Sequence, residues 1–335
     1  MTSTIDVLRG DIVESRHNVS VAVTDADGAL VAHAGDPDLV TFWRSAAKPF
    51  QAMPVVLDGA ADHWKLTSDE LALACASHSS EPIHLDVADH MLRKIGCTEQ
   101  DLACGPHPPL GADVSEAMPR VGIAMTPRWS NCSGKHAAML ALARHRGWPT
   151  AGYEREDHPV QGRCLDEVAR WTGLPRETIR LAVDGCTAVS YGLPLQAMAT
   201  AYARLGASDE PAARRIRGAM MQHPGLVAGT GRLCTDLMTA YPGQVVVKVG
   251  ADGIYSAAWP SAGVGIALKI EDGDMRSARP ALLAVLRQLA DGGQIALPGD
   301  DWPVAVARHA ELPTLNTRGG VTGVLRAAGR LRFAA

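Results

Sequence analysis

Ser45 and Lys48 combine a hydroxyl and an amine at a spacing that suits nucleophilic chemistry. Only six of the 32 basic residues are Lys, and the others are Arg. Arg does not give up its proton in a protein, whereas a buried Lys can, so a Lys in this chain points mildly to chemistry that needs a titratable amine. Residues three apart lie on one face of a helix. A neutral Lys48 could therefore take the proton of Ser45 for acyl transfer, at a helix start that favours an oxyanion.

This motif is short, and an ordinary surface charge is the simpler interpretation of any single Lys. A second group of hydroxyls lies in the stretch CASHSSE, at Ser77, Ser79 and Ser80. Serines are common in loops and helix caps, which is one explanation for this group. The functional alternative is a second hydroxyl that relays a proton or holds the substrate.

Two cysteines lie in stretches with further metal-binding side chains. Cys132 is in NCSGKH at a Gly-containing helix start, and Cys186 is in DGCT. Chemistry alone suggests a thiolate-rich zinc site from Cys132, His136 and Cys186. Free cysteines are more often small buried apolar residues, so a structural role for both stays open.

Composition excludes several classes of protein. The net charge is −4 and there is no basic run, so we expect no nucleic-acid partner. No apolar stretch is long enough to span a membrane, and the N-terminal stretch lacks the apolar region of a secretory signal. Seven cysteines without such a signal make a disulfide framework improbable. We therefore expect a cytoplasmic protein that does not bind membranes.

The elements that would position these residues follow a simple order. Alternating residues predict a hairpin within the first forty residues, and helical spacing begins near Ser45. The pattern from about 130 to 240 is mainly helical, and strand character returns in 244–260 and 263–274 before a late helix at 277–292. Because antiparallel strands need neighbours, one sheet from both chain ends is the economical arrangement. We predict an α+β fold with a sheet lobe (about 1–45 and 243–335) and a mostly helical lobe (about 46–242).

Several stretches together resemble the Rhizobium-type L-asparaginases, a family with the serine β-lactamase and glutaminase fold. The resemblance covers roughly residues 10–290, and Lys248-Val249-Gly250 resembles the Lys-Thr-Gly strand motif of serine β-lactamases. Val249 in place of the hydroxyl residue argues against β-lactam chemistry. The stretches lie at 44–51, 75–84, 104–109, 131–140, 184–195 and 248–253.

The resemblance implies hydrolysis of L-asparagine to L-aspartate and ammonia. Ser45 and Lys48 match the first Ser–Lys pair of the family, and Ser77 matches the serine of the second. The lysine of that second pair is assigned to Lys248, although Lys269 on the neighbouring strand is an alternative.

The resemblance also implies a zinc site, with Cys132, Lys135 and Cys186 as ligands. Lys135 then takes the place that chemistry alone gave to His136. A lysine ligand must be neutral, which explains why Arg would not serve. Asp184 matches an aspartate beside the metal.

We therefore predict that Ser45 attacks the side-chain amide with Lys48 as base, and that the Ser77–Lys248 pair helps to hydrolyse the acyl-enzyme. By analogy with β-lactamases, the backbone N–H groups of Ser45 and Ala251 would form the oxyanion hole. A homodimer is expected. Alternatives are another serine hydrolase of this fold (a glutaminase, peptidase or esterase) or a non-catalytic zinc-binding relative. The further substrate-binding candidates are Arg44, His136 and Asp184.

Overall fold

The computed structural model describes residues 3–111, 115 and 124–334. The chain divides into two compact units, and each is described by itself. Unit 1 comprises residues 1–46, 193–207 and 236–335, and unit 2 comprises residues 47–192 and 208–235. Within the described residues, no helix has both the length and the apolar character needed to cross a bilayer.

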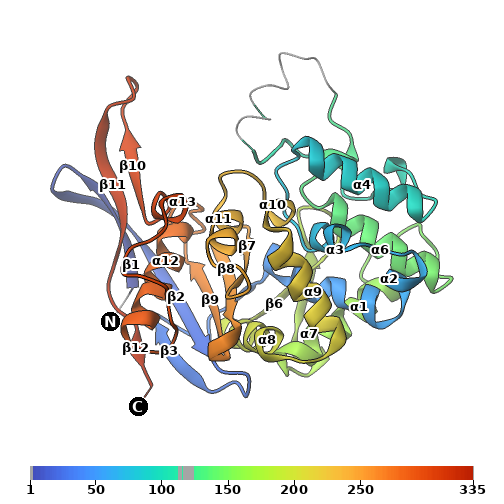
Figure 1. Cartoon of the computed structure of the whole chain (residues 1–335), viewed down its shortest axis with the longest axis horizontal. Helices are drawn as coiled ribbons and strands as arrows, with labels where there is room; N and C mark the ends of the chain where they lie inside the picture. The colour runs from blue at the N-terminus through green and yellow to red at the C-terminus, as the bar shows by residue number, and fades with distance from the viewer. Residues whose placement is uncertain (1–2, 112–114, 116–123, 335) are drawn as a thin grey trace. The chain divides into compact units, whose positions relative to one another are not determined.

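Unit 1 is built on an antiparallel sheet with the strand order β10-β11-β1-β2-β9-β8-β7, in which β3 pairs with both β2 and β12. Strands from the two ends of the chain are neighbours in this sheet (Figure 1). The predicted α+β class, with one sheet made from both chain ends, is therefore confirmed. The strands are β1 (Ser3–Arg9), β2 (Ile12–Thr24), β3 (Leu30–Ala34), β7 (Val246–Gly250), β8 (Ile254–Trp259), β9 (Val264–Ile270), β10 (Glu311–Leu315), β11 (Val321–Ala328) and β12 (Arg332–Phe333).

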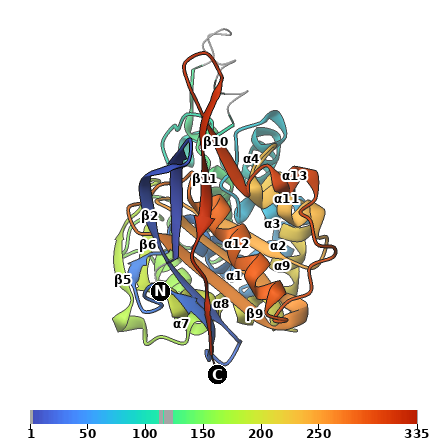
Figure 2. The same cartoon turned by 90° about the vertical axis from the view of Figure 1, so that its left-hand side faces the viewer.

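Two helices of unit 1 pack against this sheet. Figure 2 shows α12 (Ala278–Asp291) lying across the strands, and α8 (Leu195–Ala207) contacts β9, β8 and β2. The close approach of α8 depends on Gly265 in β9, because a Cβ there would lie 2.0 Å from the carbonyl oxygen of Ala199. Strand β4 (Val40–Phe42) and helix α13 (Val304–Ala307) complete the regular elements that lie wholly in unit 1, apart from a 3-10 turn, η5 (Pro260–Ala262).

The hairpin of β7 and β8 carries two of the predicted site residues. Lys248 lies opposite Ser256 in the ladder, and Ala251 is in the turn that joins the strands. Gly253 closes this turn at a φ of 77°, and a Cβ there would lie 2.7 Å from Cβ of Ile270. A glycine is therefore required where this turn passes the neighbouring strand.

Unit 2 is mainly helical, and most of α1 is buried by contacts with α6, α7 and α9. Thr67 caps the helix that begins at Ser68, where the backbone N–H of Thr67 donates to Glu70 Oε2 at 2.8 Å. The helices are α1 (Lys48–Leu57), α2 (Ala60–His63), α3 (Ser68–Ala74), α4 (Pro82–Lys94), α6 (Ser133–His145), α7 (Pro159–Thr172), α9 (Pro211–Gln222) and α10 (Pro224–Val227), with 3-10 turns η2 (Glu99–Asp101), η3 (Pro127–Trp129) and η4 (Arg176–Thr178).

A hairpin interrupts the region in which the sequence pattern is mainly helical. Strands β5 (Arg180–Val183) and β6 (Val189–Pro194) pair in antiparallel fashion, with Val183 opposite Val189. Its loop turns at Thr187, which has a φ of 76°. The β-branched residues and the short loop favour a hairpin over a helix here. This hairpin matters because its loop carries Asp184 and Cys186.

Candidate active site

Lys48 is the first residue of α1, and its side chain is 1% exposed. Its Nζ donates to the carbonyl oxygen of Ala76 at 2.5 Å and to Ser77 Oγ at 3.0 Å. Cys132 Sγ lies 3.1 Å from the same nitrogen. Polar partners of this kind offset the cost of burying an amine. The structure thus joins Lys48 to Ser77, the serine that the resemblance places in the second pair.

The backbone around Ser77 is held by several long-range hydrogen bonds. The Ser77 N–H donates to the carbonyl oxygen of Val227 at 3.0 Å, and the His78 N–H donates to that of Asn131 at 3.2 Å. The Ser77 carbonyl accepts a hydrogen bond from Nη1 of Arg232. Sequence reasoning missed Arg232, although a Gly-Thr-Gly stretch directly precedes it. These contacts give the Ser77 hydroxyl a defined position beside the Lys48 amine.

Two stacked histidines lie next to the loop that carries Ser77. The rings of His78 and His84 are 5.1 Å apart at an angle of 15°, and both are fully buried. Nδ1 of His78 accepts from the Ser80 N–H at 3.2 Å, and Nε2 lies 2.9 Å from Ser133 Oγ. Burial lowers the pKa of both histidines. We therefore treat His78 as a neutral ring that ties the Ser77 loop to the start of α6.

The predicted zinc ligands lie together in unit 2. Cys132 precedes α6, Lys135 is in its first turn, and Cys186 comes from the loop between β5 and β6. Lys135 Nζ lies 2.9 Å from Cys186 Sγ, and Cys132 and Cys186 share a hydrogen bond. All three side chains are buried, with exposures of 4%, 3% and 7% in sequence order.

The two thiols have opposite electrostatic character. The hydrogen bond from Cys132 lowers the pKa of Cys186, and the same bond raises the pKa of Cys132. Burial lowers the pKa of Lys135, but its interactions with Cys186, Cys132 and Asp184 together outweigh burial and raise that pKa. One thiolate therefore balances one ammonium in this cluster.

The donor set suits zinc only if Lys135 is included. Among the described residues, no three His, Cys, Asp or Glu side chains form a group that could hold a metal ion. The set of Cys132, His136 and Cys186 suggested by chemistry alone is thus not assembled. Nδ1 of His136 lies 2.6 Å from the phenol oxygen of Tyr153, and the ring also interacts with the Cys186 side chain. Two sulfurs and one amine nitrogen, buried side by side, are a donor set of the kind that zinc accepts.

The loop that carries Cys186 is held by Asp184. The Asp184 N–H donates to the carbonyl oxygen of Ala188 at 2.8 Å, and the Thr187 N–H donates to that of Asp184 at 2.9 Å. The Asp184 carboxylate accepts from the Gly185 N–H at 2.8 Å. Asp184 therefore shapes the loop that presents the Cys186 side chain, and its place beside a metal stays a prediction.

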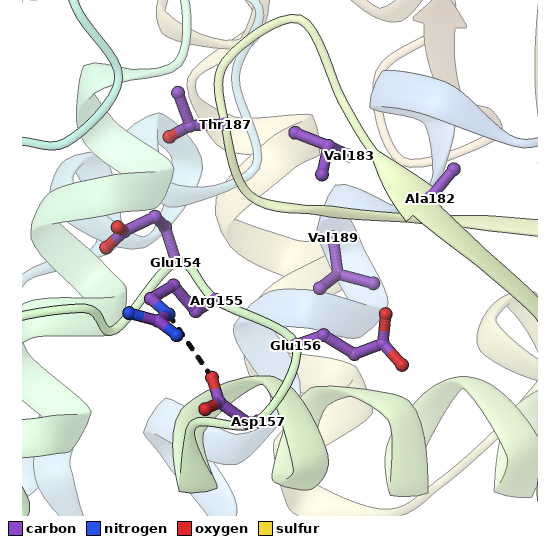
Figure 3. Close-up of a pocket in the computed structure, with 8 residues that line it drawn as sticks. All are labelled: Glu154, Arg155, Glu156, Asp157, Ala182, Val183, Thr187 and Val189. Carbon is purple, nitrogen blue, oxygen red and sulfur yellow. Dashed lines mark ion pairs between the residues drawn. The ribbon is translucent and has the colours of Figure 1, made fainter.

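A cavity of about 500 Å³ in unit 2 adjoins the β5–β6 hairpin (Figure 3). Arg155 and Asp157 form an ion pair across part of its rim at 3.4 Å. None of the predicted catalytic residues or metal ligands lines this cavity, so it is distinct from the candidate active site. Its lining residues are Glu154, Arg155, Glu156, Asp157, Ala182, Val183, Thr187 and Val189.

The remaining predicted site residues belong to unit 1. Ser45 is half-buried in the 3-10 turn η1 (Arg44–Ala47) that leads into α1. Arg44 has a φ of 55° and forms an ion pair with Asp252. Lys248 is fully buried in β7, and its Nζ donates to the carbonyl oxygen of Val249 at 2.8 Å. The assignments of Ser45, Arg44, Lys248 and Ala251 to the site stay predictions.

Lys269, the alternative to Lys248, also has a buried amine. Its Nζ donates to the carbonyl oxygens of Ile270 and Glu271 in its own strand region. Burial lowers the pKa of Lys269, and the nearby carboxylates of Asp252 and Asp272 act against this effect. Both lysines are therefore amines in a largely dry setting, and the choice between them stays open.

Comparisons with known proteins bear on fold and family. Among solved structures, native Mglu is 15% identical at a TM-score of 0.46, with 84% of this chain and 63% of that chain covered. A β-lactamase from Mycobacterium bovis is 14% identical at a TM-score of 0.44, with 83% and 95% covered. This chain thus spans less than two thirds of the length of the Mglu chain. Both scores are below 0.5, so these likenesses add no weight to the family assignment.

No curated protein sequence matches the chain. The family described as L-asparaginase II matches residues 5–327. Because this match takes in nearly the whole chain, the protein belongs to the L-asparaginase II family, whose members are asparaginase-type amidohydrolases.

Proposed function

We propose that this protein hydrolyses L-asparagine to L-aspartate and ammonia. The observation that carries the proposal is the buried amine of Lys48, 3.0 Å from the Ser77 hydroxyl. An amine held against a serine in a dry environment is the arrangement that amide hydrolysis through an acyl-enzyme requires. The family match over residues 5–327 supports an amide as the substrate.

In the proposed reaction, Ser45 Oγ attacks the side-chain amide carbon while Lys48 accepts the hydroxyl proton. The C–N bond then breaks, a proton passes to the leaving nitrogen, and ammonia departs from a β-aspartyl ester on Ser45. Water attacks this ester and loses its proton to the second Ser–Lys pair. The bond between the acyl carbon and Ser45 Oγ then breaks, a proton returns to Ser45 Oγ, and L-aspartate is released. Ser77 is placed to relay protons because its oxygen adjoins the Lys48 amine. The pairing of Ser45 with Lys48 rests on their spacing.

Cys132, Lys135 and Cys186 would hold a zinc ion in this proposal. Bound there, zinc would supply a fixed positive charge toward which a polar group of the substrate could orient. Binding requires Cys132 to lose its thiol proton and Lys135 to be neutral, so zinc affinity is coupled to proton release. Lys48 links this cluster to the hydroxyl chemistry, since its Nζ contacts both Cys132 and Ser77.

An ammonia-release assay tests the proposal directly. Purified wild-type protein should release ammonia from L-asparagine with a higher kcat/KM than from L-glutamine, and Ser45→Ala should abolish the release. A preference for L-glutamine, or for a peptide or ester, would show that the proposed substrate is wrong, while the proposed Ser–Lys mechanism would still hold. A protein that binds zinc but hydrolyses none of these compounds would be the non-catalytic relative.

A further inference from the structure

Arg232 presents a positively charged group at the Ser77 loop. It is half-buried at the end of the stretch Gly229-Thr-Gly231, directly before α11 (Leu233–Ala240). Its Nη1 donates to the carbonyl oxygen of Ser77 and, at 3.3 Å, to that of Ala228. One nitrogen thus anchors the guanidinium to the backbone of a proposed catalytic serine.

The rest of this guanidinium is available to a ligand. Within the described part of the chain, Nε and Nη2 of Arg232 have no hydrogen-bond partner and no carboxylate lies within ion-pair distance. Several other guanidiniums of unit 2 are paired with acids, such as Arg163 with Asp58 at 3.0 Å, whereas Arg144 donates to a backbone carbonyl as Arg232 does. Arg44, the arginine predicted from sequence to bind substrate, is paired with Asp252. A half-buried guanidinium that lacks a counter-ion is a binding site for an anion.

The local charge around Ser77 also favours an anion. Lys48 approaches Ser77 at its hydroxyl and Arg232 at its carbonyl. The Glu81 carboxylate lies at the same stretch, where it accepts from the backbone N–H and the hydroxyl of Thr230. No carboxylate of the described residues lies within ion-pair distance of Arg232. A substrate that brings its own negative charge would complete this arrangement.

We propose that Arg232 binds the α-carboxylate of the amino-acid substrate, an inference that rests on the proposed function. In L-asparagine the α-carboxylate is separated from the reacting amide carbon by two carbon atoms. The guanidinium adjoins the Ser77 backbone, so an amide held near Ser77 would leave the α-carboxylate two carbon atoms away for Arg232 to bind. A planar guanidinium pairs with a carboxylate through two parallel N–H bonds, which a lysine does not reproduce. Arg232 then selects free amino acids over amides that lack this carboxylate.

The test compares two substrates that differ only in the α-carboxylate. L-Asparagine carries it, and L-aspartic acid diamide has an uncharged carboxamide in its place. Arg232→Gln should lower kcat/KM for L-asparagine by about 10- to 100-fold, the range expected for a lost charged hydrogen bond. The loss should appear mainly as a higher KM, because it is a loss of ground-state binding. For the diamide, kcat/KM should change by less than about 3-fold, since no charged partner is lost.

Two further variants separate binding from positioning. Arg232→Lys keeps the charge and should recover part of the affinity for L-asparagine. Arg144→Gln is the matched control, because Arg144 also donates through Nη1 to a backbone carbonyl, that of Gly96 at 2.7 Å. Arg144→Gln should leave kcat/KM unchanged for both substrates. If Arg232→Gln instead lowered kcat equally on both substrates, Arg232 would serve only to position Ser77, and the proposal would be overturned.

Direct binding keeps this inference separate from the proposed function. Calorimetric titration with L-aspartate should show affinity weakened by about 10- to 100-fold in Arg232→Gln and unchanged in Arg144→Gln. If the wild type released no ammonia from L-asparagine, the proposed function would fail, and this titration would still decide the carboxylate site. Equal L-aspartate affinity in wild type and Arg232→Gln, or no binding by either, would overturn it.

Discussion

Lys48 shows why the chemistry of single side chains matters in an arginine-rich chain. Its amine is enclosed by a carbonyl, a hydroxyl and a sulfur, all within 3.1 Å. A guanidinium is larger than this enclosure and does not release its proton. The same two reasons apply to Lys135, whose amine lies against the Cys186 sulfur. At both places a compact amine that can become neutral is needed.

Lys48→Arg should therefore be nearly as damaging as Lys48→Ala, because the reaction needs a removable proton and not a positive charge. The measurement is kcat for ammonia release at pH 7 for both variants. Circular dichroism and melting temperature control for misfolding, and Lys94→Arg, which alters the ion pair with the buried Glu70 carboxylate and preserves its charge, should keep full activity. Near-normal turnover by Lys48→Arg would remove Lys48 from the role of base.

Ser45→Ala should lower kcat by at least ~10³-fold, as the loss of a covalent route does. Ser79→Ala provides a control within the second serine group. The Ser79 hydroxyl is buried and has no hydrogen-bond partner among the described residues, so its removal should leave kcat unchanged and not reduce stability. If Ser45→Ala kept a tenth of the wild-type kcat while Ser77→Ala was inactive, the two serines would exchange roles.

At the scale of elements, His84 in the first turn of α4 makes the stability of the protein depend on pH. The ring of His84 accepts from the Glu81 N–H at Nδ1, at 3.1 Å, and its Nε2 lies 2.9 Å from the carbonyl oxygen of Gly225. Both contacts are satisfied by a neutral ring that carries its proton on Nε2. Protonation of Nδ1 would remove an acceptor inside the protein, in addition to the cost of burying the charge.

The free energy of unfolding should therefore fall as pH drops below about 6.5, the pKa of His in an unfolded chain. Burial lowers the folded-state pKa of His84, so in this window the unfolded state binds more protons and stability rises with pH. Below the folded-state pKa the dependence levels off. Denaturant unfolding of His84→Gln should show a weaker pH dependence than the wild type. His90→Gln, an exposed position on the same helix, should retain the wild-type dependence.

Close packing of α6 on α3 provides a second prediction at this scale. A Cβ at Gly134 would lie 2.3 Å from the carbonyl oxygen of Leu73. This oxygen belongs to the backbone and cannot move away as the end of a flexible side chain could. Gly134→Ala should reduce the free energy of unfolding by ~1–3 kcal/mol through overpacking. Gly218→Ala in α9 is the matched control, since nothing lies within 4 Å of its Cβ position. It should be neutral or stabilise by about 0.5–1 kcal/mol, and equal effects of the two changes would contradict this account.

At the scale of the whole molecule, the role of the metal can be separated from the serine chemistry. Chelation should raise KM more than it lowers kcat, because a metal that orients the substrate contributes to ground-state binding. Cys132→Ser and Lys135→Ala should reproduce this effect, with zinc content measured by metal analysis. A purely structural metal would instead lower the melting temperature and leave KM unchanged. Metal-free wild-type protein with normal KM would exclude the substrate-orienting role.

The family assignment concerns the chain as a whole, since the match runs from residue 5 to residue 327. It places the protein among asparaginase-type amidohydrolases and leaves the substrate to be measured. The predicted homodimer also stays a prediction, which sedimentation equilibrium would test. The cavity beside the β5–β6 hairpin does not belong to the candidate active site.

By itself, the sequence determined the features that depend on local pattern. Ser45 and Lys48 are close in sequence at a helix start, so their types and spacing indicated the chemistry before any fold was known. Alternating apolar residues indicated strands at both ends of the chain, and helical spacing indicated helices between them. Cys132 directly precedes α6 and Lys135 lies in its first turn, and their joint presence with Cys186 was recognisable from the resemblance.

Tertiary structure alone decided which distant groups meet. Lys48 contacts Ser77 and Cys132 across 29 and 84 positions, and Arg232 reaches Ser77 across 155. No periodicity encodes such contacts, because they arise when helices pack in a particular order and bring loops together. The β5–β6 hairpin is a similar case, since it interrupts a mainly helical region to present Cys186. Local spacing therefore predicted the reacting groups, while packing decided that Arg232 anchors the Ser77 loop.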